Sequence, residues 1–229
     1  MAAMPEGWIA IETSGDRAST ALAGPDGSVI EEVITGTRRH AAELVPAIAR
    51  VLARAGRRPE DLHGIVVSEG PGSFTGLRIG ATVAKALAHV HRCPLRTASA
   101  LSVMARGAWR ESAVVESAGC DQSVLAVTDA LRGEVYAALY RIGPGRLDVI
   151  RAPVVIRPAE LSGWPAADLR ASLPPLASTL LDLLEVDGGT VPVHDLETWE
   201  PEYGRPAEAQ AKWEAAHGRR LPDSSGTAR

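Results

Sequence analysis

Residues 70–80 hold the pattern in this sequence that best suits ligand binding: Gly-Pro-Gly-Ser-Phe-Thr-Gly-Leu-Arg-Ile-Gly, leading into a helical pattern. Backbone N–H groups at a helix N-terminus point outward, so a glycine-rich loop that enters a helix can hold a phosphate. Gly72 and Ser73 are the candidate contacts. The segment is not a P-loop, because no Gly-Lys-Ser/Thr follows. The alternative is structural, since glycines permit a tight turn and close helix packing, and their spacing alone favours this interpretation.

Polar side chains also end a predicted strand in each half of the chain. Glu12, Thr13 and Ser14 follow the first strand, and Asp129 ends a later one. In actin-like ATPases the residues at the position of 12–14 contact the phosphates and their metal. Facing carboxylates of Glu12 and Asp129 could hold Mg²⁺ between two lobes. The same residues could instead end strands and make turn hydrogen bonds. The turn interpretation is favoured, because no adenine pocket can be located in the sequence.

Side chains for covalent or metal chemistry are not grouped in this sequence. Ser73 and Ser99 have no evident histidine or aspartate support, so nucleophilic catalysis has no basis. His89 and His91 lie two apart on a predicted helix and point to different faces, so they cannot share a metal. We therefore expect no catalytic residue, no metal site and no required cofactor.

Length and charge limit the classes of protein that remain. The 229 residues suffice for one large domain or two smaller lobes, and 45% of them are hydrophobic. The net charge of −4 argues against a chain that binds nucleic-acid phosphates unaided. No apolar run has membrane-spanning length, and residues 1–7 do not resemble a secretory signal. We expect the two cysteines, Cys93 and Cys120, to be reduced thiols. We expect a cytoplasmic protein without membrane contact.

Two stretches of the chain share an order of strands and turns. Periodicity and turn residues predict strands at 8–12, 18–23, 28–34 and 65–68, helices at 39–56 and 77–91, and further strands at 124–129, 134–142 and 147–156. The order βββαβα is the half-unit of ribonuclease H-like, actin-type (ASKHA) folds. We therefore expect an α/β fold of two actin-like lobes, the second degenerate. The expected bounds are 1–95 for the N-terminal lobe, 96–222 for the C-terminal lobe and 223–229 for a disordered tail.

Three stretches resemble a known family. Residues 70–80 with the Ala-Lys-Ala-Leu-Ala at 84–88, the opening Ala-Ile-Glu-Thr-Ser at 10–14, and Asp-Ala-Leu-Arg-Gly-Glu-Val-Tyr at 129–136 are similar to the TsaB (YeaZ) family of bacterial tRNA threonylcarbamoyladenosine biosynthesis. The likeness covers most of residues 8–156. Residues 161–193 depart from it most.

The resemblance implies a non-catalytic scaffold subunit. Such a subunit would bind a catalytic TsaD-type paralogue, joined by a TsaE-type ATPase, for threonylcarbamoylation of the adenosine next to the anticodon. Its contact with tRNA would be indirect, and ATP and Mg²⁺ would enter only in the complex. The catalytic paralogue carries a metal-binding His-x-x-x-His after the equivalent of Pro94, whereas residues 97–104 here contain no histidine, cysteine or carboxylate. This chain should therefore not perform the transfer.

The resemblance also places the shared interface on the first two helices, whose apolar and small side chains suit helix–helix packing. We expect the partner interface at Leu44, Val45, Ile48, Leu52, Leu77, Gly80, Ala81, Ala84 and Ala88. On this view, a large residue at Gly80 or Ala84 would abolish partner binding and leave the chain folded. A free chain could cover the same face by self-pairing, so a homodimer is also expected.

Two alternatives stay open. The chain could be a small ATP-dependent kinase or transferase of the actin-like superfamily, which would use Glu12, Asp129 and Mg²⁺. In the tail, Trp199, Tyr203 and Trp213 could anchor an interface or pack back on their own lobe.

Overall fold

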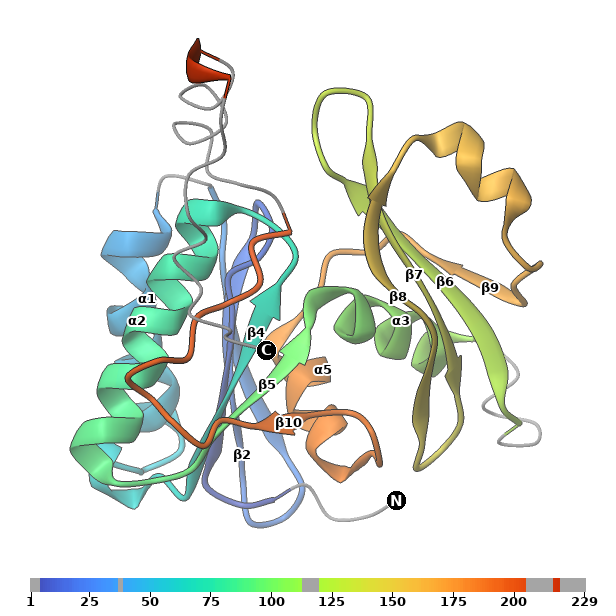
Figure 1. Cartoon of the computed structure of the whole chain (residues 1–229). Helices are drawn as coiled ribbons and strands as arrows, with labels where there is room; N and C mark the ends of the chain where they lie inside the picture. Colours follow the sequence, from blue (N-terminus) through green and yellow to red (C-terminus); the bar gives the residue numbers. More distant parts are fainter. Residues whose placement is uncertain (1–4, 37–38, 113–119, 205–215, 219–229) are drawn as a thin grey trace.

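The computed structural model describes residues 5–36, 39–112, 120–204 and 216–218, and shows two lobes, each built on one sheet (Figure 1). Among the described residues, the first sheet has six strands in the order β10-β5-β4-β1-β2-β3. The second has four, in the order β8-β7-β6-β9. The predicted α/β fold of two lobes is confirmed.

The secondary-structure elements have the following bounds. The first sheet comprises β1 (Trp8–Glu12), β2 (Ala18–Ala23), β3 (Val29–Ile34), β4 (Gly64–Gly70), β5 (Leu95–Ser99) and β10 (Val191–Pro192). The second comprises β6 (Gln122–Asp129), β7 (Val135–Ile142), β8 (Leu147–Ile156) and β9 (Leu169–Ala171). The helices are α1 (His40–Arg54), α2 (Phe74–His91), α3 (Ala100–Glu111) and α5 (Ala177–Asp182), with short 3₁₀ turns η1 (Pro59–Asp61), η2 (Pro158–Gly163) and η3 (Leu183–Glu185). None of the described helices combines the length and apolar character needed to cross a membrane.

Strand β1 lies in the middle of the first sheet and sets which side chains face which helices. It pairs antiparallel with β2 and parallel with β4. Because side chains alternate along a strand, Ile9 and Ile11 pack with α1 and α2, whereas Ala10 belongs to the core on the other face. By the same alternation, Glu12 faces the side of α3 and α5.

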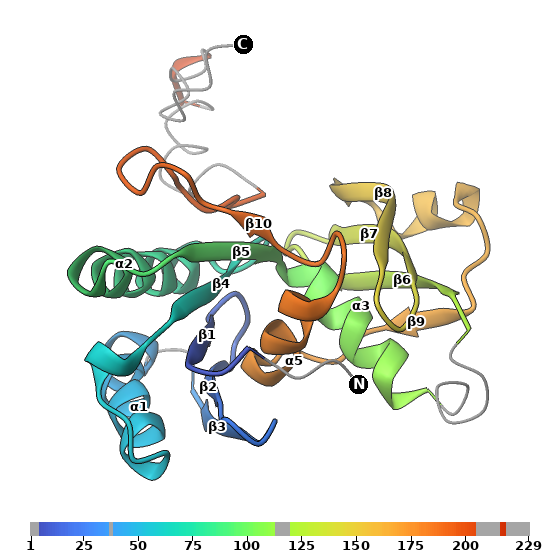
Figure 2. The same cartoon turned by 90° about the horizontal axis from the view of Figure 1, so that it is seen from below.

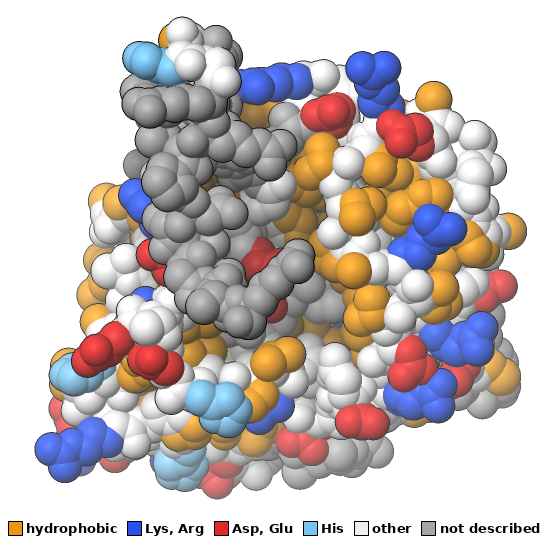
Figure 3. Space-filling model, viewed as in Figure 1, with side chains coloured by type: hydrophobic (Ala, Val, Ile, Leu, Met, Phe, Trp, Pro, Cys, Tyr) orange, Lys and Arg blue, Asp and Glu red, His pale blue; other side chains and the backbone are white. Residues whose placement is uncertain are grey.

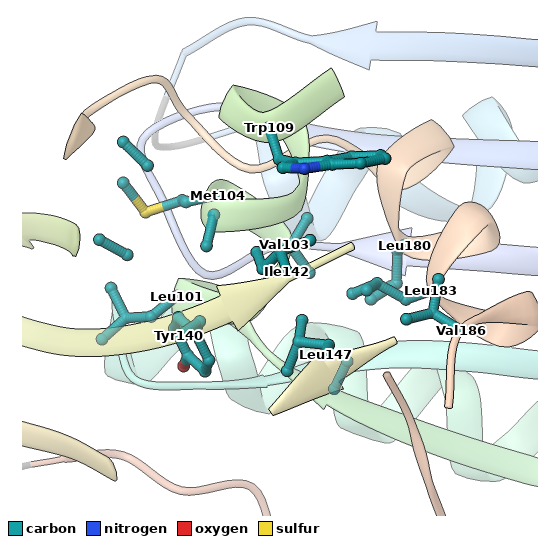
Figure 4. Close-up of a cluster of buried hydrophobic side chains, with 14 of the residues drawn as sticks. Leu101, Val103, Met104, Trp109, Tyr140, Ile142, Leu147, Leu180, Leu183 and Val186 are labelled. Carbon is teal, nitrogen blue, oxygen red and sulfur yellow. The ribbon is translucent and has the colours of Figure 1, made fainter. Parts of the chain in front are cut away.

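Helices fill the space between the two sheets. α1 and α2 cover the outer face of the first sheet, and α3 and α5 lie between the sheets (Figure 2). The core between the sheets is continuous, with Leu101 and Trp109 of α3 lying near Tyr140 and Ile142 of β7 and Leu180 of α5 (Figure 4). The two lobes therefore share one hydrophobic core.

Arg106 of α3 joins the lobes by hydrogen bonds. Its guanidinium donates to the Asp182 carboxylate of α5 (2.5 Å) and to the backbone carbonyls of Gly143 (2.7 Å) and Pro144 (3.1 Å), in the turn after β7. Arg106 is only 5% exposed, so these bonds are largely shielded from water. One side chain thus holds α3, α5 and the second lobe in a fixed arrangement.

The structure moves the domain boundary that we expected between residues 95 and 96. β5 belongs to the first sheet, because the chain returns after α2 to pair in parallel with β4. Two later elements also belong to the first lobe. The Ala177 N–H of α5 donates to the Ser19 hydroxyl of β2 (2.8 Å), and β10 pairs with β5. The second sheet is limited to residues 122–171. The predicted tail at 223–229 lies outside the described residues.

Candidate functional site

A cleft of about 980 Å³ lies between the lobes at the start of α2. Its walls come from the β1–β2 turn, the loop before α2, the β6–β7 turn and residues near the C-terminal end of the described chain, and include Ser14, Gly72, Ser73, Asp129, Arg132, Tyr136 and Tyr203. Four of the six candidate phosphate contacts, drawn from both halves of the chain, therefore surround one space. The other two, Glu12 and Thr13, are fully buried.

The glycines of residues 70–80 make room for the backbone that follows β1. A β-carbon on Gly72 would clash with the carbonyl oxygen of Ser14, and one on Gly76 would clash with that of Thr13. The next glycine at four-residue spacing, Gly80, meets the Thr13 side chain. The spacing thus lets one face of α2 approach residues 13 and 14 without side chains between them. This supports the structural interpretation of the motif.

Several N–H groups that could have held a phosphate already bond within the protein. The Ser73 N–H donates to the Ser14 carbonyl (2.7 Å), the Gly76 N–H to the Ser73 hydroxyl (3.2 Å) and the Leu77 N–H to the Ser73 carbonyl (2.8 Å). Ser73 is therefore the N-cap of α2, which satisfies a first-turn amide from within the chain. Phosphate contact at Gly72 and Ser73 stays a prediction that competes with these bonds.

Glu12 is a carboxyl group held away from water. Its Oε1 accepts a hydrogen bond from the Ser14 N–H (2.6 Å), while Oε2 and the nearby Ser68 hydroxyl have no hydrogen-bond partner among the described residues. Burial raises the pKa of Glu12, and the hydrogen bond from Ser14 opposes that rise only in part. Because Glu12 is fully buried and does not line the cleft, its carboxyl group is poorly placed to ligate Mg²⁺ there.

Asp129, the predicted counterpart of Glu12, lies at the cleft in a turn. Its Oδ1 accepts a hydrogen bond from the Leu131 N–H (2.8 Å), which is the turn bond expected of an aspartate. Within the described part of the chain, no group of three or more His, Cys, Asp or Glu side chains is placed to hold a metal ion.

The β6–β7 turn brings two strained residues to the edge of the cleft. Leu131 and Arg132 have φ angles of 63° and 57°, and both belong to the left-handed region that ordinary side chains disfavour. Two such residues in succession match the twist of a hairpin, where asparagine and glycine are the usual choices. Gly133 follows at φ 77°, but leucine and arginine at 131 and 132 are not residue types that indicate this conformation in a sequence.

The predicted interface residues are mostly buried in the chain's own core. Among the nine, only Val45 is exposed, at 57%. The other eight have little or no accessible surface: Leu44, Ile48, Leu52, Leu77, Gly80, Ala81, Ala84 and Ala88. They cannot meet a partner, so a large residue at Gly80 or Ala84 would disturb the fold, contrary to our expectation.

The correction has a simple physical cause. The apolar side chains of α1 and the small side chains of α2 form one core with the outer face of the first sheet, including Ile9 and Ile65. Small residues permit close approach to any flat neighbour, and here that neighbour is the sheet itself. The sequence pattern identified a packing face but could not say what packs on it.

A different set of residues points outward from the same two helices. We call this set the α1–α2 outer face; its exposed members are Ala42, Val45, Pro46 and Ala49 of α1 and Thr82, Ala86 and Val90 of α2, with Ile79 and Val83 half-buried beside them. It is apolar and built largely of small side chains. Val45 and Val90 are its largest exposed side chains, at 57% and 69%.

Hydrophobic side chains also gather on the second lobe (Figure 3). Val149, Ile150 and Val154 of the edge strand β8 are exposed there, and the Arg151 guanidinium lies 5.0 Å from the Trp164 ring centre. This surface is on the opposite lobe from α1 and α2, so substitutions here provide controls for those on the first lobe.

Comparisons of sequence find relatives that are named for tRNA modification. The model of the family described as TsaD, tRNA N6-adenosine threonylcarbamoyltransferase, matches residues 28–178. The tRNA threonylcarbamoyladenosine biosynthesis protein TsaB of Escherichia coli is 36% identical over 133 residues, which are 58% of this chain and 54% of that protein. The protein of the same name from Bacillus subtilis is 36% identical over 143 residues, 62% of this chain and 58% of that protein. The chain spans little more than half the length of these curated relatives.

Comparisons of structure agree. YeaZ from Pseudomonas aeruginosa superposes with a TM-score of 0.71 at 26% identity, over 87% of this chain and 100% of that chain. A second structure from the same species, of an uncharacterized protein with similarity to peptidase YeaZ, gives a TM-score of 0.73 at 26% identity, over 88% and 100% of the two chains. By its family model, its relatives and its two-lobed, actin-like α/β fold, this chain belongs to the TsaB (YeaZ) family.

Proposed function

We propose that this protein is a non-catalytic subunit in the formation of threonylcarbamoyladenosine in tRNA, and that it works by binding a catalytic TsaD-type paralogue. A TsaE-type ATPase joins the pair, and the complex acts in the cytoplasm. This chain contacts tRNA only indirectly, through the complex. The names of the relatives support the pathway. The scaffold role is our inference from this chain.

The α1–α2 outer face is the observation that carries the proposal. Two neighbouring helices offer a surface of small apolar side chains, and two valines in it, Val45 and Val90, are more than half exposed. Ion pairs flank the α1 side, where Arg50 contacts Glu32 (2.5 Å) and Arg39 contacts Glu43 (2.8 Å). An apolar centre with a charged rim is typical of a protein–protein interface.

A partner with the same architecture would present an equivalent pair of helices. Two helix pairs can then pack face to face, and the small residues allow their axes to approach closely. In the absence of that partner, a second copy of this chain can cover the face, so we expect the isolated protein to form a homodimer. Partner and second copy would then compete for one surface.

The cleft supports a role without chemistry of its own. Ser73 and Ser14 use amides of the glycine-rich loop for internal bonds, and Glu12 is buried with a raised pKa. We expect ATP and Mg²⁺ to bind in the complex rather than to the isolated chain. A rival kinase or transferase would need Glu12 to reach the metal, whereas its side chain is fully buried.

Reconstitution tests the proposal. The purified chain is mixed with the TsaD-type subunit from the same organism, and the mass of the complex is measured by light scattering. Modification of tRNA is then followed by mass spectrometry of nucleosides, with and without this chain. We expect a stable complex and modification only when the chain is present. Micromolar binding and turnover of MgATP by the isolated chain would instead favour the kinase.

A further inference from the structure

Arg78 is held in place by two aromatic rings at one end of the α1–α2 outer face. Its guanidinium carbon lies 4.6 Å from the ring centre of Phe74 and 6.0 Å from that of Tyr203, and its Nε donates to the Tyr203 hydroxyl (3.4 Å). The two rings themselves are 4.4 Å apart. Arg78 is exposed, and among the described residues its two terminal nitrogens have no partner.

Tyr203 comes from far along the chain and is itself fixed. Its carbonyl accepts a hydrogen bond from the Tyr136 hydroxyl of the second lobe (3.4 Å). The carbonyl of Glu202 lies where a β-carbon on Gly70 would be. Earlier in the same segment, the Trp199 ring lies 5.6 Å from the Lys85 ammonium group of α2. Residues 199–203 therefore position the Arg78 side chain without help from another molecule.

Arg78 is continuous with the proposed interface. Phe74, Arg78, Thr82, Ala86 and Val90 follow one another at four-residue spacing, so they form one ridge along α2. The ridge runs from the mouth of the cleft into the α1–α2 outer face. Arg78 is the only charged residue on this ridge.

The charges near Arg78 favour one kind of occupant. A guanidinium fork suits a carboxylate or a phosphate. The adjoining cleft is lined by three carboxylates and one guanidinium, those of Asp16, Asp129, Glu134 and Arg132, and Glu202 precedes Tyr203, so a polyanion such as an RNA backbone would meet more negative than positive charges. A single carboxylate at the edge of an apolar interface meets no such obstacle.

We infer that Arg78, held by Phe74 and Tyr203, receives an aspartate or glutamate side chain of the catalytic partner at the rim of the shared interface. This inference rests on the proposed function. Because the guanidinium is ordered before binding, little side-chain entropy is lost when the pair forms. Lysine in its place would keep the charge but lose the planar fork and the stacking on the rings.

The test is the affinity for the catalytic subunit, measured by calorimetry with the full chain. We expect Arg78→Lys and Tyr203→Ala each to weaken binding about ten-fold or more, because each loses the fixed guanidinium fork that pairs with a carboxylate. Tyr203→Phe keeps the ring and should have the smallest effect. Arg151→Lys is the matched control, because Arg151 also lies over an aromatic ring, Trp164, but on the other lobe.

The outcomes separate the two proposals. Wild-type affinity for Arg78→Lys, with wild-type protein bound normally, would overturn this inference and leave the proposed function standing. Absence of any wild-type complex would overturn the proposed function. An anticodon stem-loop RNA that binds the chain alone, and loses that binding in Arg78→Lys, would show that the guanidinium takes a phosphate and would overturn the assignment to a carboxylate. Circular dichroism checks that each variant is folded.

Discussion

The side chain of Thr13 occupies the place that a β-carbon on Gly80 would need. The conflict is with the Thr13 hydroxyl oxygen, which is buried and has no hydrogen-bond partner among the described residues. Helix α2 can therefore approach the end of β1 only because position 80 has no side chain. The contact involves the far end of one side chain and not backbone, so a second substitution can remove it.

This relationship predicts strong coupling between the two positions. Gly80→Ala alone should destabilise the fold by roughly 1–3 kcal/mol through overpacking. Thr13→Ala removes a buried hydroxyl that makes no hydrogen bond and should cost little. The double variant should be at least as stable as the parent, because alanine is favoured over glycine in a helix by about 1 kcal/mol. Urea unfolding of the four proteins measures the coupling.

Gly107 provides the control for this cycle. It lies in α3, and a β-carbon there would meet Thr179 Oγ1 at 3.8 Å, an ordinary contact. Gly107→Ala should therefore stabilise the protein by roughly 0.5–1 kcal/mol. Additive effects of Thr13→Ala and Gly80→Ala would contradict the contact described above.

Much of the fold could be predicted from the sequence because its signals are local. The C-terminal ends of the strands at Glu12 and Asp129 were predicted to the residue, since apolar runs end there in polar turn residues; the second strand begins at Gln122, two residues before its predicted start. The helix after the glycine-rich loop was also predicted, although it begins at Phe74 and not at residue 77. The sequence could not show which surface packs against each face of a helix. Ala84 and Val45 both belong to apolar stretches, yet the sheet buries the first and leaves the second exposed.

The contacts around Arg78 show a second limit. Phe74 and Tyr203 are in ring contact but are far apart in the sequence, and nothing local links them. Tyr203 and Trp199 were noted as rare aromatic residues that could anchor an interface or pack back. The structure shows both packing back, Trp199 beside Lys85 and Tyr203 beside Phe74. Trp213 lies outside the described residues.

The buried carboxyl of Glu12 predicts a dependence of stability on pH. Its pKa in the unfolded chain is near the ordinary 4.5, and burial raises the pKa in the folded chain. The folded protein holds the proton more tightly, so stability present below pH 4.5 is lost as the pH rises through the folded pKa. Each unit of pKa shift corresponds to about 1.4 kcal/mol.

Glu12→Gln should therefore gain stability relative to the parent as the pH rises above 4.5, and the gain should level off above the folded pKa. The amide keeps an acceptor for the Ser14 N–H and adds a donor near Ser68. Unfolding by urea at a series of pH values measures the difference. The exposed Glu185→Gln is the control and should show no such trend. A constant difference between Glu12→Gln and the parent would refute a raised pKa.

The hydrogen bonds of Arg106 predict a large effect from one substitution between the lobes. Arg106→Met removes the donors for the Gly143 and Pro144 carbonyls and leaves Asp182 with a weaker partner, Arg110, at 3.5 Å. Loss of one member of a buried pair costs about 3–5 kcal/mol. Because the lobes share a core, we expect one unfolding transition at lower urea concentration.

Arg146→Ala is the matched control, because its ion pair with Asp148 is half exposed and should contribute less than about 1 kcal/mol. Two separate transitions in Arg106→Met would mean that the lobes unfold independently, against the continuous core seen here.

The left-handed turn predicts a stabilising substitution. Leu131 has a φ of 63° and is 70% exposed, so its side chain contributes little packing to offset a conformational cost of about 1–2 kcal/mol. Leu131→Gly removes that cost but adds conformational entropy to the unfolded chain. We therefore expect the free energy of unfolding to rise by about 0.5–1 kcal/mol. Leu173→Gly, at an exposed leucine outside the left-handed region, should destabilise instead. Thermal unfolding compares the two; destabilisation by both would argue against strain at the turn.

The exposed and buried sides of the two helices predict opposite behaviour for substitutions only a few residues apart. Val45→Glu and Ala86→Glu lie on the α1–α2 outer face, and glutamate is a good helix former, so both should leave stability within about 0.5 kcal/mol of the parent. Each places a charge in the proposed interface and should weaken pairing with the catalytic subunit, or self-pairing, at least ten-fold. Ala84→Leu should instead overpack the core and lower the unfolding temperature, because Ala84 has no accessible surface. Val149→Glu adds the same charge to the second lobe and should pair normally. Normal pairing by both Val45→Glu and Ala86→Glu would place the interface elsewhere.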